Sequence, residues 1–119
     1  MNKIRIEQSG DSMLIIDSKR IKIQRYNEIV SLQYDKPYVR IKTSIKGNNL
    51  LYSNLSELKK FLPEYFIQIN KATIVNLKFV ESIEIIKNQC IAKVEDFEYI
   101  ISRRREKIVF EYFKRNFPS

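Results

Sequence analysis

The sequence predicts a mainly β fold with two peripheral α-helices, in which the strands form small antiparallel sheets. Three observations support this prediction. Short apolar runs with the spacing of strands fill most of the first hundred residues, helical spacing occurs in two segments, and strands do not alternate regularly with helices. The last observation argues against a doubly wound parallel sheet, and no pair of predicted helices resembles a helix-turn-helix.

The first strands are expected in pairs joined by short turns. The clearest one, residues 38–43, alternates between an apolar and a polar face, and Tyr38, Arg40 and Lys42 share the polar face. A turn at Gly47-Asn48 leads from it into the next strand. The other strands of this half are expected over residues 13–16, 21–23, 29–34 and 49–52, with a hairpin turn at residues 17–19.

One short helix is expected after these strands. Asn54 is its predicted N-cap, and Glu57, three residues later, resembles the second member of a capping box. Pro63 should end the helix, because proline cannot continue the hydrogen-bonding pattern. The buried stripe is expected to comprise Leu55, Leu58, Phe61 and Leu62.

A second set of strands leads to a helix that closes the chain. Ser102 is the expected cap of this helix. Its apolar residues recur at helical spacing: Ile108, Val109, Tyr112 and Phe113. The strands before it are expected over residues 66–69, 81–86, 90–94 and 97–101.

The composition is that of a small basic globular domain. With 119 residues, 44% of them hydrophobic, the chain can fold as one domain over residues 1–119. Its 22 Lys and Arg against 14 Asp and Glu give a net charge of +8. This excess indicates a polyanionic partner, either nucleic acid or an acidic membrane surface, and the simpler alternative is a merely soluble basic protein. No apolar run approaches the ~20 residues needed to span a bilayer.

Enzyme chemistry finds little support in the sequence. The chain has no histidine and a single cysteine, Cys90, which excludes a zinc finger and an intrachain disulfide. Cys90 lies in a predicted strand and is expected to be a small core or near-surface residue, and Ser102 has no histidine to activate it. No glycine-rich phosphate loop is present. We therefore expect no enzymatic activity, no cofactor and no metal, and a location in the reducing cytoplasm.

The strongest local anomaly is the run Ser102-Arg103-Arg104-Arg105 at the start of the last predicted helix. Each arginine there opposes the helix dipole by roughly a few tenths of a kcal/mol or more. The same place suits an anion, because free N–H groups, a hydroxyl and guanidinium groups converge on it. We interpret the run as a DNA contact. The alternative is a solvated charge run that extends into water or pairs with Glu106 and nearby acids.

Two further segments are weaker candidates. The loop at residues 35–38 runs into the basic strand face, where cations including Lys36 could follow phosphates and Tyr38 could contact a sugar or base. Polar residues 70–73 separate two apolar runs, which predicts a turn that projects Lys71. Taken alone, each segment is better explained as ordinary structure. The first would be a hairpin edge whose lysines prevent pairing with other strands, and the second would be a simple connector.

Four segments occur in an order and spacing that match a known family. Residues 66–80 read FIQINKATIVNLKFV, residues 29–43 contain Y-x-K-P-Y-V-x-I-x-T, residues 54–62 form the first helix, and residues 101–104 read ISRR. Together they resemble the LytTR family of bacterial DNA-binding domains, whose signature runs roughly F-x-R-I-H-x-S-x-[IVL]-V-N-x-x-x-I. The resemblance spans about residues 10–117, and the order of the four segments is more specific than any one of them.

The resemblance implies three small antiparallel sheets flanked by two helices. It also implies that loops, and not a recognition helix, read DNA by entering successive major grooves on one face of a bent duplex. The family's contact positions fall on Tyr38, Lys71 and Arg104. Three residues of the signature loop depart from the family's usual Arg, His and Ser: Gln68, Asn70 and Ala72.

We therefore expect sequence-specific binding of duplex DNA by a bacterial transcriptional regulator, or by the output domain of a two-component response regulator. Arg104 would form a fork onto guanine O6 and N7 or onto phosphates, while Tyr38 and Lys71 would contact the neighbouring groove. The expected DNA-binding residues are Tyr38, Arg40, Lys42, Asn70, Lys71, Arg103, Arg104 and Arg105.

Other partners and functions follow as expectations. The resemblance implies a homodimer on repeated sites and an upstream receiver domain or sensor kinase, and no small-molecule substrate. Since nothing precedes the domain in this sequence, we expect a stand-alone regulator or a fragment of a longer one. The alternatives are a basic module that binds protein or an anionic membrane surface through Lys59 and Lys60, and single-stranded RNA binding by Tyr34 and Tyr38.

Overall fold

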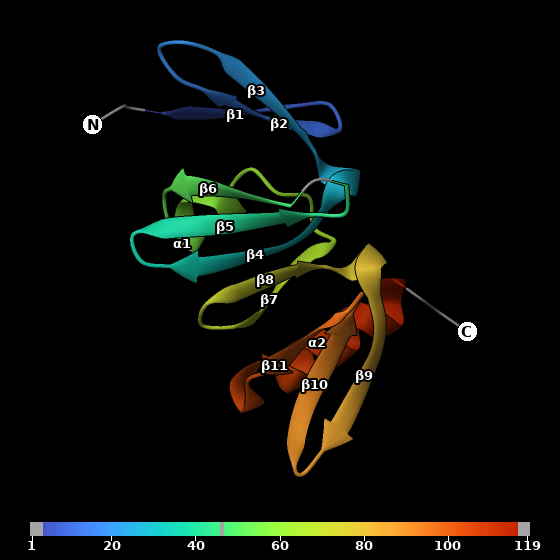
Figure 1. Ribbon diagram of the computed structural model, residues 1–119. Helices are drawn as coiled ribbons and strands as arrows, with labels where there is room; N and C mark the ends of the chain where they lie inside the picture. Colours follow the sequence, from blue (N-terminus) through green and yellow to red (C-terminus); the bar gives the residue numbers. More distant parts are fainter. Residues whose placement is uncertain (1–3, 46, 117–119) are drawn as a thin grey trace. The chain divides into compact units, whose positions relative to one another are not determined.

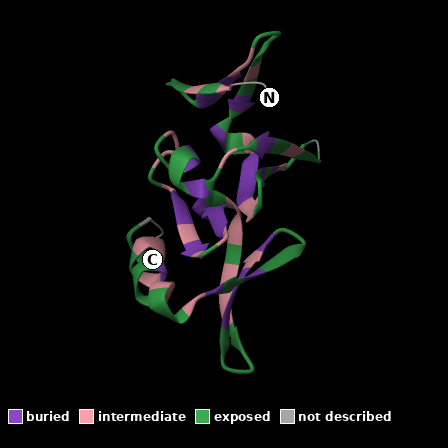
Figure 2. Ribbon diagram, turned by 90° about the vertical axis from the view of Figure 1, so that its left-hand side faces the viewer, coloured by how far each residue is buried: buried purple, intermediate pink, exposed green. Residues whose placement is uncertain are grey.

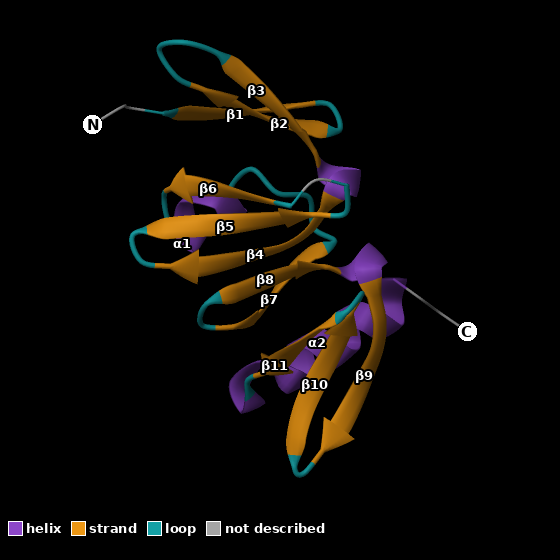
Figure 3. Ribbon diagram, in the orientation of Figure 1, coloured by secondary structure: helices purple, strands orange, loops and turns teal. Residues whose placement is uncertain are grey.

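The computed structural model describes residues 4–45 and 47–116, and within them it confirms the mainly β fold (Figure 1). The chain divides into two compact units, unit 1 (Met1–Pro63) and unit 2 (Glu64–Ser119). Each unit combines antiparallel strands with one α-helix and a short 3-10 turn (Figure 3). Neither helix of the described part is long and apolar enough to cross a membrane.

Unit 1 begins with a three-stranded antiparallel sheet, ordered as in the sequence: β1 (Arg5–Ser9), β2 (Ser12–Ile16) and β3 (Ile21–Arg25). The predicted hairpin between the last two is confirmed. The carboxylate of Asp17 accepts hydrogen bonds from the main-chain N–H groups of Lys19 (2.7 Å) and Arg20 (2.9 Å), which closes the turn. The sequence pattern misses β1, because four of its five residues are polar and give no apolar alternation.

The second set of strands in unit 1 contains the strand that was predicted most clearly. Val39 and Ile41 are fully buried, whereas Tyr38 and Arg40 are exposed, so the predicted alternation is confirmed. Gly47, with a φ of +44°, precedes the last strand in a conformation that glycine adopts without strain. The strands pair antiparallel in the order β6-β5-β4: β4 (Ile29–Asp35), β5 (Tyr38–Thr43) and β6 (Asn48–Tyr52).

The first helix, α1 (Leu55–Lys59), begins where the sequence predicts. The side-chain oxygen of Asn54 accepts a hydrogen bond of 3.0 Å from the main-chain N–H of Glu57, which confirms the N-cap. Leu55 and Leu58 are buried, as the predicted stripe requires.

The predicted end of α1 is too late. The α-helix stops at Lys59, and the chain continues through turns to Pro63. In this stretch the hydroxyl of buried Tyr26 donates a hydrogen bond to the carbonyl oxygen of Phe61. A tertiary contact of this kind, from a residue far upstream, is not encoded in the local spacing of apolar residues.

Unit 2 contains a β-hairpin, a three-stranded antiparallel sheet and the longer helix. The hairpin turn falls at Lys71-Ala72, where the sequence predicts it, although the second strand of this hairpin was not predicted as a separate element. The elements are β7 (Phe66–Asn70), β8 (Thr73–Asn76), β9 (Val80–Ile86), β10 (Gln89–Val94), β11 (Phe97–Ile101) and α2 (Arg103–Asn116), with the sheet order β11-β10-β9.

The longer helix α2 packs against β7, the first strand of the hairpin in unit 2. Strand β11 also contacts β7. Val109 of α2 is buried and Tyr112 is half-buried, whereas Ile108, predicted in the same stripe, is 57% exposed. Buried residues concentrate in the strands, and the turns are exposed (Figure 2). Five strands separate α1 from α2, so the described residues form no helix-turn-helix, as predicted.

Candidate nucleic-acid interface

The residues predicted to contact DNA lie on three segments. In unit 1 they share one strand, β5: Tyr38, Arg40 and Lys42. In unit 2 they lie at the turn between β7 and β8 and in the first turn of α2: Asn70, Lys71, Arg103, Arg104 and Arg105.

The face of β5 in unit 1 presents an aromatic ring beside a cation. Tyr38 is 42% exposed, and its ring packs edge-on against Tyr52, with ring centroids 5.8 Å apart and an interplanar angle of 79°. The Arg40 guanidinium lies 3.6 Å from the Asp35 carboxylate, but both side chains are largely exposed. An exposed pair of this kind is weak, so Arg40 remains available to a stronger anion such as a phosphate. Lys42, on the same face, is half-buried.

The β7–β8 turn in unit 2 is closed by two side-chain amides. The side-chain oxygen of Asn70 accepts a hydrogen bond from the main-chain N–H of Ala72 at 2.9 Å. The side-chain nitrogen of Gln68 donates to the carbonyl oxygens of Asn70 (3.1 Å) and Lys71 (3.3 Å). These bonds fix the backbone of the turn, while the Lys71 side chain is exposed at its tip.

The turn is joined directly to the start of α2. The side-chain nitrogen of Asn70 donates a hydrogen bond of 2.6 Å to the carbonyl oxygen of Ile100. Next to it, the main-chain N–H of Ser102 donates to the carbonyl oxygen of Ile69 at 2.9 Å. Two of the three predicted contact segments therefore belong to one hydrogen-bonded assembly within unit 2.

The first turn of α2 presents three arginines. Arg103 and Arg104 are exposed, and Arg105 is half-buried. No carboxylate within residues 4–45 and 47–116 lies at ion-pair distance from any of the three, so the expected alternative of pairing with Glu106 is not observed. The main-chain carbonyl of Ser102 accepts a hydrogen bond of 2.9 Å from the N–H of Arg105, an i→i+3 bond at the start of α2. The site concentrates positive charge where an anion fits.

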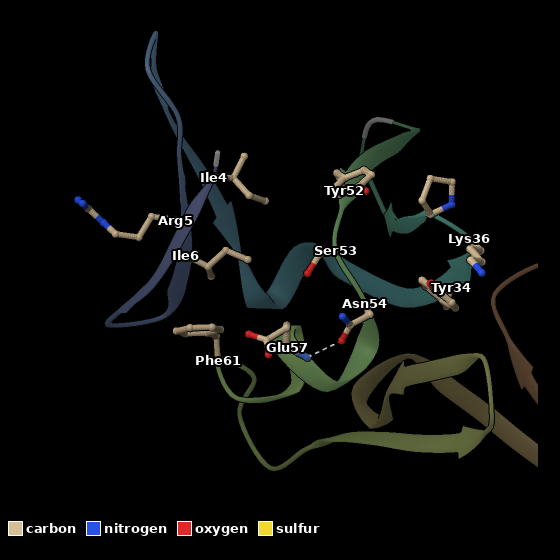
Figure 4. A pocket seen from close by; sticks show the side chains of 11 residues that line it. Ile4, Arg5, Ile6, Tyr34, Lys36, Tyr52, Ser53, Asn54, Glu57 and Phe61 are labelled. Atoms are coloured by element: carbon tan, nitrogen blue, oxygen red, sulfur yellow. Dashed lines mark hydrogen bonds between the residues drawn. The ribbon is translucent and has the colours of Figure 1, made fainter. Parts of the chain in front are cut away.

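A hollow of about 650 Å³ in unit 1 has a different character (Figure 4). Its wall combines apolar side chains with the charged residues Arg5, Lys36 and Glu57. The main-chain N–H of Glu57 donates the hydrogen bond by which the Asn54 side chain caps α1. The Glu57 carboxylate lies 3.2 Å from the Lys60 ammonium. In the described part of the chain, no three His, Cys, Asp or Glu residues are grouped as metal ligands.

Cys90, the single cysteine, is buried in β10. Burial raises the pKa of its thiol, and the negative charge of Glu106 adds to the increase. A thiol with a raised pKa is a poor nucleophile, which agrees with the interpretation of Cys90 as a core residue.

Sequence reasoning missed two features of these segments. Asn70 was predicted as a DNA contact, and its use of both ends of the amide within the protein was not foreseen. The spacing from Asn70 to the N–H two residues on is that of an Asx turn, a signal that could have identified one of these bonds. The contact between Tyr38 and Tyr52 was also missed, and it follows from their position as direct partners across β5 and β6.

A family model and a solved structure both relate the chain to the LytTr DNA-binding domain. The model of the LytTr DNA-binding domain family matches residues 19–114. Among solved structures, the chain is similar to a LytTr DNA-binding domain from Bacillus cereus, described as part of a methyl-accepting/DNA response regulator. The TM-score is 0.72 at 11% sequence identity, over 87% of this chain and 97% of that one. No curated protein matches the sequence.

Proposed function

Because the chain belongs to the LytTr DNA-binding domain family, we propose that it binds duplex DNA sequence-specifically and acts in bacterial transcription regulation. The observation that carries the proposal is the family match, which includes all three basic segments described above. We further propose that residues 1–119 act as one DNA-binding domain, either as a regulator or as the output domain of one.

Within this function, the start of α2 is the best candidate for reading bases. Arg104 is exposed, lies in the first turn of α2, and has no acidic partner among the described residues. Its planar guanidinium can donate two hydrogen bonds to guanine O6 and N7 in the major groove. Arg103 and Arg105 would then contact phosphates on either side, because they flank the reader on the same turn.

The other two segments would contribute contacts of different kinds. Lys71 is exposed on the turn that is hydrogen-bonded to the start of α2, and its ammonium would contact a phosphate or a base acceptor. In unit 1, Tyr38 offers a hydroxyl and an apolar ring, and Arg40 offers a cation beside it. A turn, a strand and a helix start would therefore contact DNA, with no recognition helix.

The alternative of a membrane-surface module is not supported by the short helix. An interfacial helix needs an exposed apolar face, but α1 has only five residues and its Leu55 and Leu58 are buried. Lys59 and Lys60 are then an ordinary solvated face that can add to general attraction for DNA. A homodimer on repeated sites and an upstream receiver domain remain proposals that follow from the family.

Selection from a library of randomised duplexes tests the function. We expect the protein to enrich one short sequence, and the enriched duplex to bind more tightly than a scrambled duplex of equal length and composition. Anionic lipid vesicles of matched charge serve as the control surface. Binding of all duplexes and of vesicles with similar affinity would show a general polyanion binder and would overturn the proposal.

A further inference from the structure

We infer that Asn70 is a positioning residue for DNA recognition, which holds Lys71 and Arg104 in one fixed arrangement. The inference rests on the proposed function and adds to it a role for a residue that does not itself read a base. It starts from the amide of Asn70, which serves two segments that are thirty residues apart in the sequence.

Both ends of the Asn70 amide are engaged inside the protein. The oxygen accepts from the N–H of Ala72 and shapes the turn that carries Lys71, while the nitrogen donates to the carbonyl of Ile100, two residues before the cap of α2. An asparagine that reads adenine uses the same two atoms, its oxygen and its nitrogen, as one bidentate pair. The intramolecular bonds already orient that pair, so the geometry favours positioning over direct reading.

A second bond next to it gives the connection its rigidity. The main-chain bond from Ser102 to Ile69 holds the two segments together at one point. A single hydrogen bond leaves the segments free to tilt about it, whereas two neighbouring bonds restrict that tilt. The Asn70 bond is the one of the two that a side-chain substitution can remove, and the geometry of Arg104 relative to Lys71 should depend on it.

The contribution of Asn70 can be isolated with matched variants. Asn70→Asp keeps the shape and the oxygen that closes the turn, and it replaces the donor to Ile100 with a second oxygen. Asn70→Ser replaces the amide with a shorter side chain that carries one hydroxyl, so the amide donor to Ile100 is lost without added charge. Gln68→Ala is the control, because it loosens the same turn through its bonds to the carbonyls of residues 70 and 71 and leaves the bond to Ile100 intact.

The measured quantity is the ratio of affinities for the selected duplex and a scrambled duplex, in which a uniform effect of charge cancels. We expect both Asn70 variants to reduce this ratio by about 3- to 30-fold, the range over which coupling mutations commonly act. Gln68→Ala should change it by less than either. In an Arg104→Ala background, the Asn70 substitutions should have little further effect on the ratio, because the arrangement of Arg104 relative to Lys71 that Asn70 holds no longer exists.

The possible failures are distinguishable. If the wild-type protein shows no preference for any duplex, the proposed function fails. If the wild-type protein is selective and folded Asn70 variants keep the same ratio, only the positioning role is overturned. The positioning role is also overturned if the Asn70 variants lose the same amount of selectivity in the wild-type background and in the Arg104→Ala background. Thermal unfolding of each variant identifies a variant that does not fold, and the less disruptive of the two Asn70 substitutions then decides the question.

Discussion

The main-chain N–H of Ser102 donates a hydrogen bond of 2.9 Å to the carbonyl oxygen of Ile69, so the residue before α2 is attached to the end of β7. The direction in which α2 begins is therefore set by the hairpin against which this helix packs. Side chains in the first turn of such a helix start from a fixed backbone. A fixed backbone favours specific recognition, because less conformational entropy is lost when the contact forms.

Substitution of Arg104 should separate reading from general attraction. We predict that Arg104→Ala lowers affinity for the selected duplex by about 1–3 kcal/mol and relaxes base preference at one position. Folding should be unchanged or slightly improved, because a cation is removed from the positive end of the helix dipole. Lys59→Ala, on the solvated face of α1, is the control and should weaken all duplexes about equally. An equal loss on selected and scrambled DNA would identify Arg104 as a phosphate contact only.

Binding should depend strongly on salt, because the chain carries a net charge of +8. If the protein neutralises ~6 phosphates, the logarithm of the binding constant should fall with the logarithm of salt concentration with a slope of about −5. Fluorescence anisotropy of a labelled duplex at several salt concentrations measures this slope. A flat plot would contradict an electrostatic origin of the affinity.

The ring of Tyr52 should support Tyr38 in unit 1. Tyr52→Ala removes the edge-on partner of Tyr38, and we predict a loss of about 0.5–1.5 kcal/mol in affinity for the selected duplex, because the Tyr38 ring then loses its fixed orientation. Tyr52→Phe keeps the ring and should bind like the wild type. If both substitutions leave binding unchanged by isothermal titration, Tyr38 does not contribute through this orientation.

The cap of α1 should contribute measurably to stability. Asn54→Ala removes the acceptor for the N–H of Glu57, and we predict a decrease of about 1 kcal/mol in the free energy of unfolding. Urea denaturation followed by circular dichroism provides the measurement. Asn54→Ser retains an acceptor oxygen and should restore most of the loss, and a stability equal to that of Asn54→Ala would argue against the capping role.

The buried thiol gives a test that depends on pH. Burial raises the pKa of Cys90 in the folded state. There is therefore a pH range in which the Cys90 thiol keeps its proton in the folded protein and has lost it in the unfolded chain. The stability that Cys90 contributes is therefore complete below the ordinary thiol pKa of about 8.5 and is lost as pH rises through the folded-state pKa. As pH rises above the ordinary thiol pKa of about 8.5, Cys90→Ala should lose less stability than the wild type. Equal slopes for both proteins would show that the thiol does not titrate differently on folding.

The same thiol should react slowly in the native protein. At pH 8 we expect a disulfide reagent to label Cys90 far more slowly than it labels the protein in urea, because both burial and protonation protect the sulfur. Rapid labelling of the folded protein would contradict the buried position.

Most strands could be predicted because the signal for a half-buried strand is local. In β5, alternate residues face either the core or water. The sequence shows the same alternation, with apolar Val39 and Ile41 between the exposed residues Tyr38 and Arg40. The strand β1 could not be predicted, because its residues are mostly polar and exposed and show no alternation of apolar and polar positions. The end of α1 was misplaced because proline marks only where a helix cannot continue, and not where tertiary contacts end it earlier.

The sequence by itself determined the fold class, the basic charge, the cap of α1, the family and the three segments expected at the DNA. Each of these depends on residue type and on spacing over a few positions. Only the tertiary structure decided that the turn at Lys71 and the arginines of α2 belong to one assembly, and that Asn70 connects them. Hydrogen bonds between residues thirty positions apart depend on how strands and helix pack, and a linear pattern of apolar and polar residues does not specify that packing.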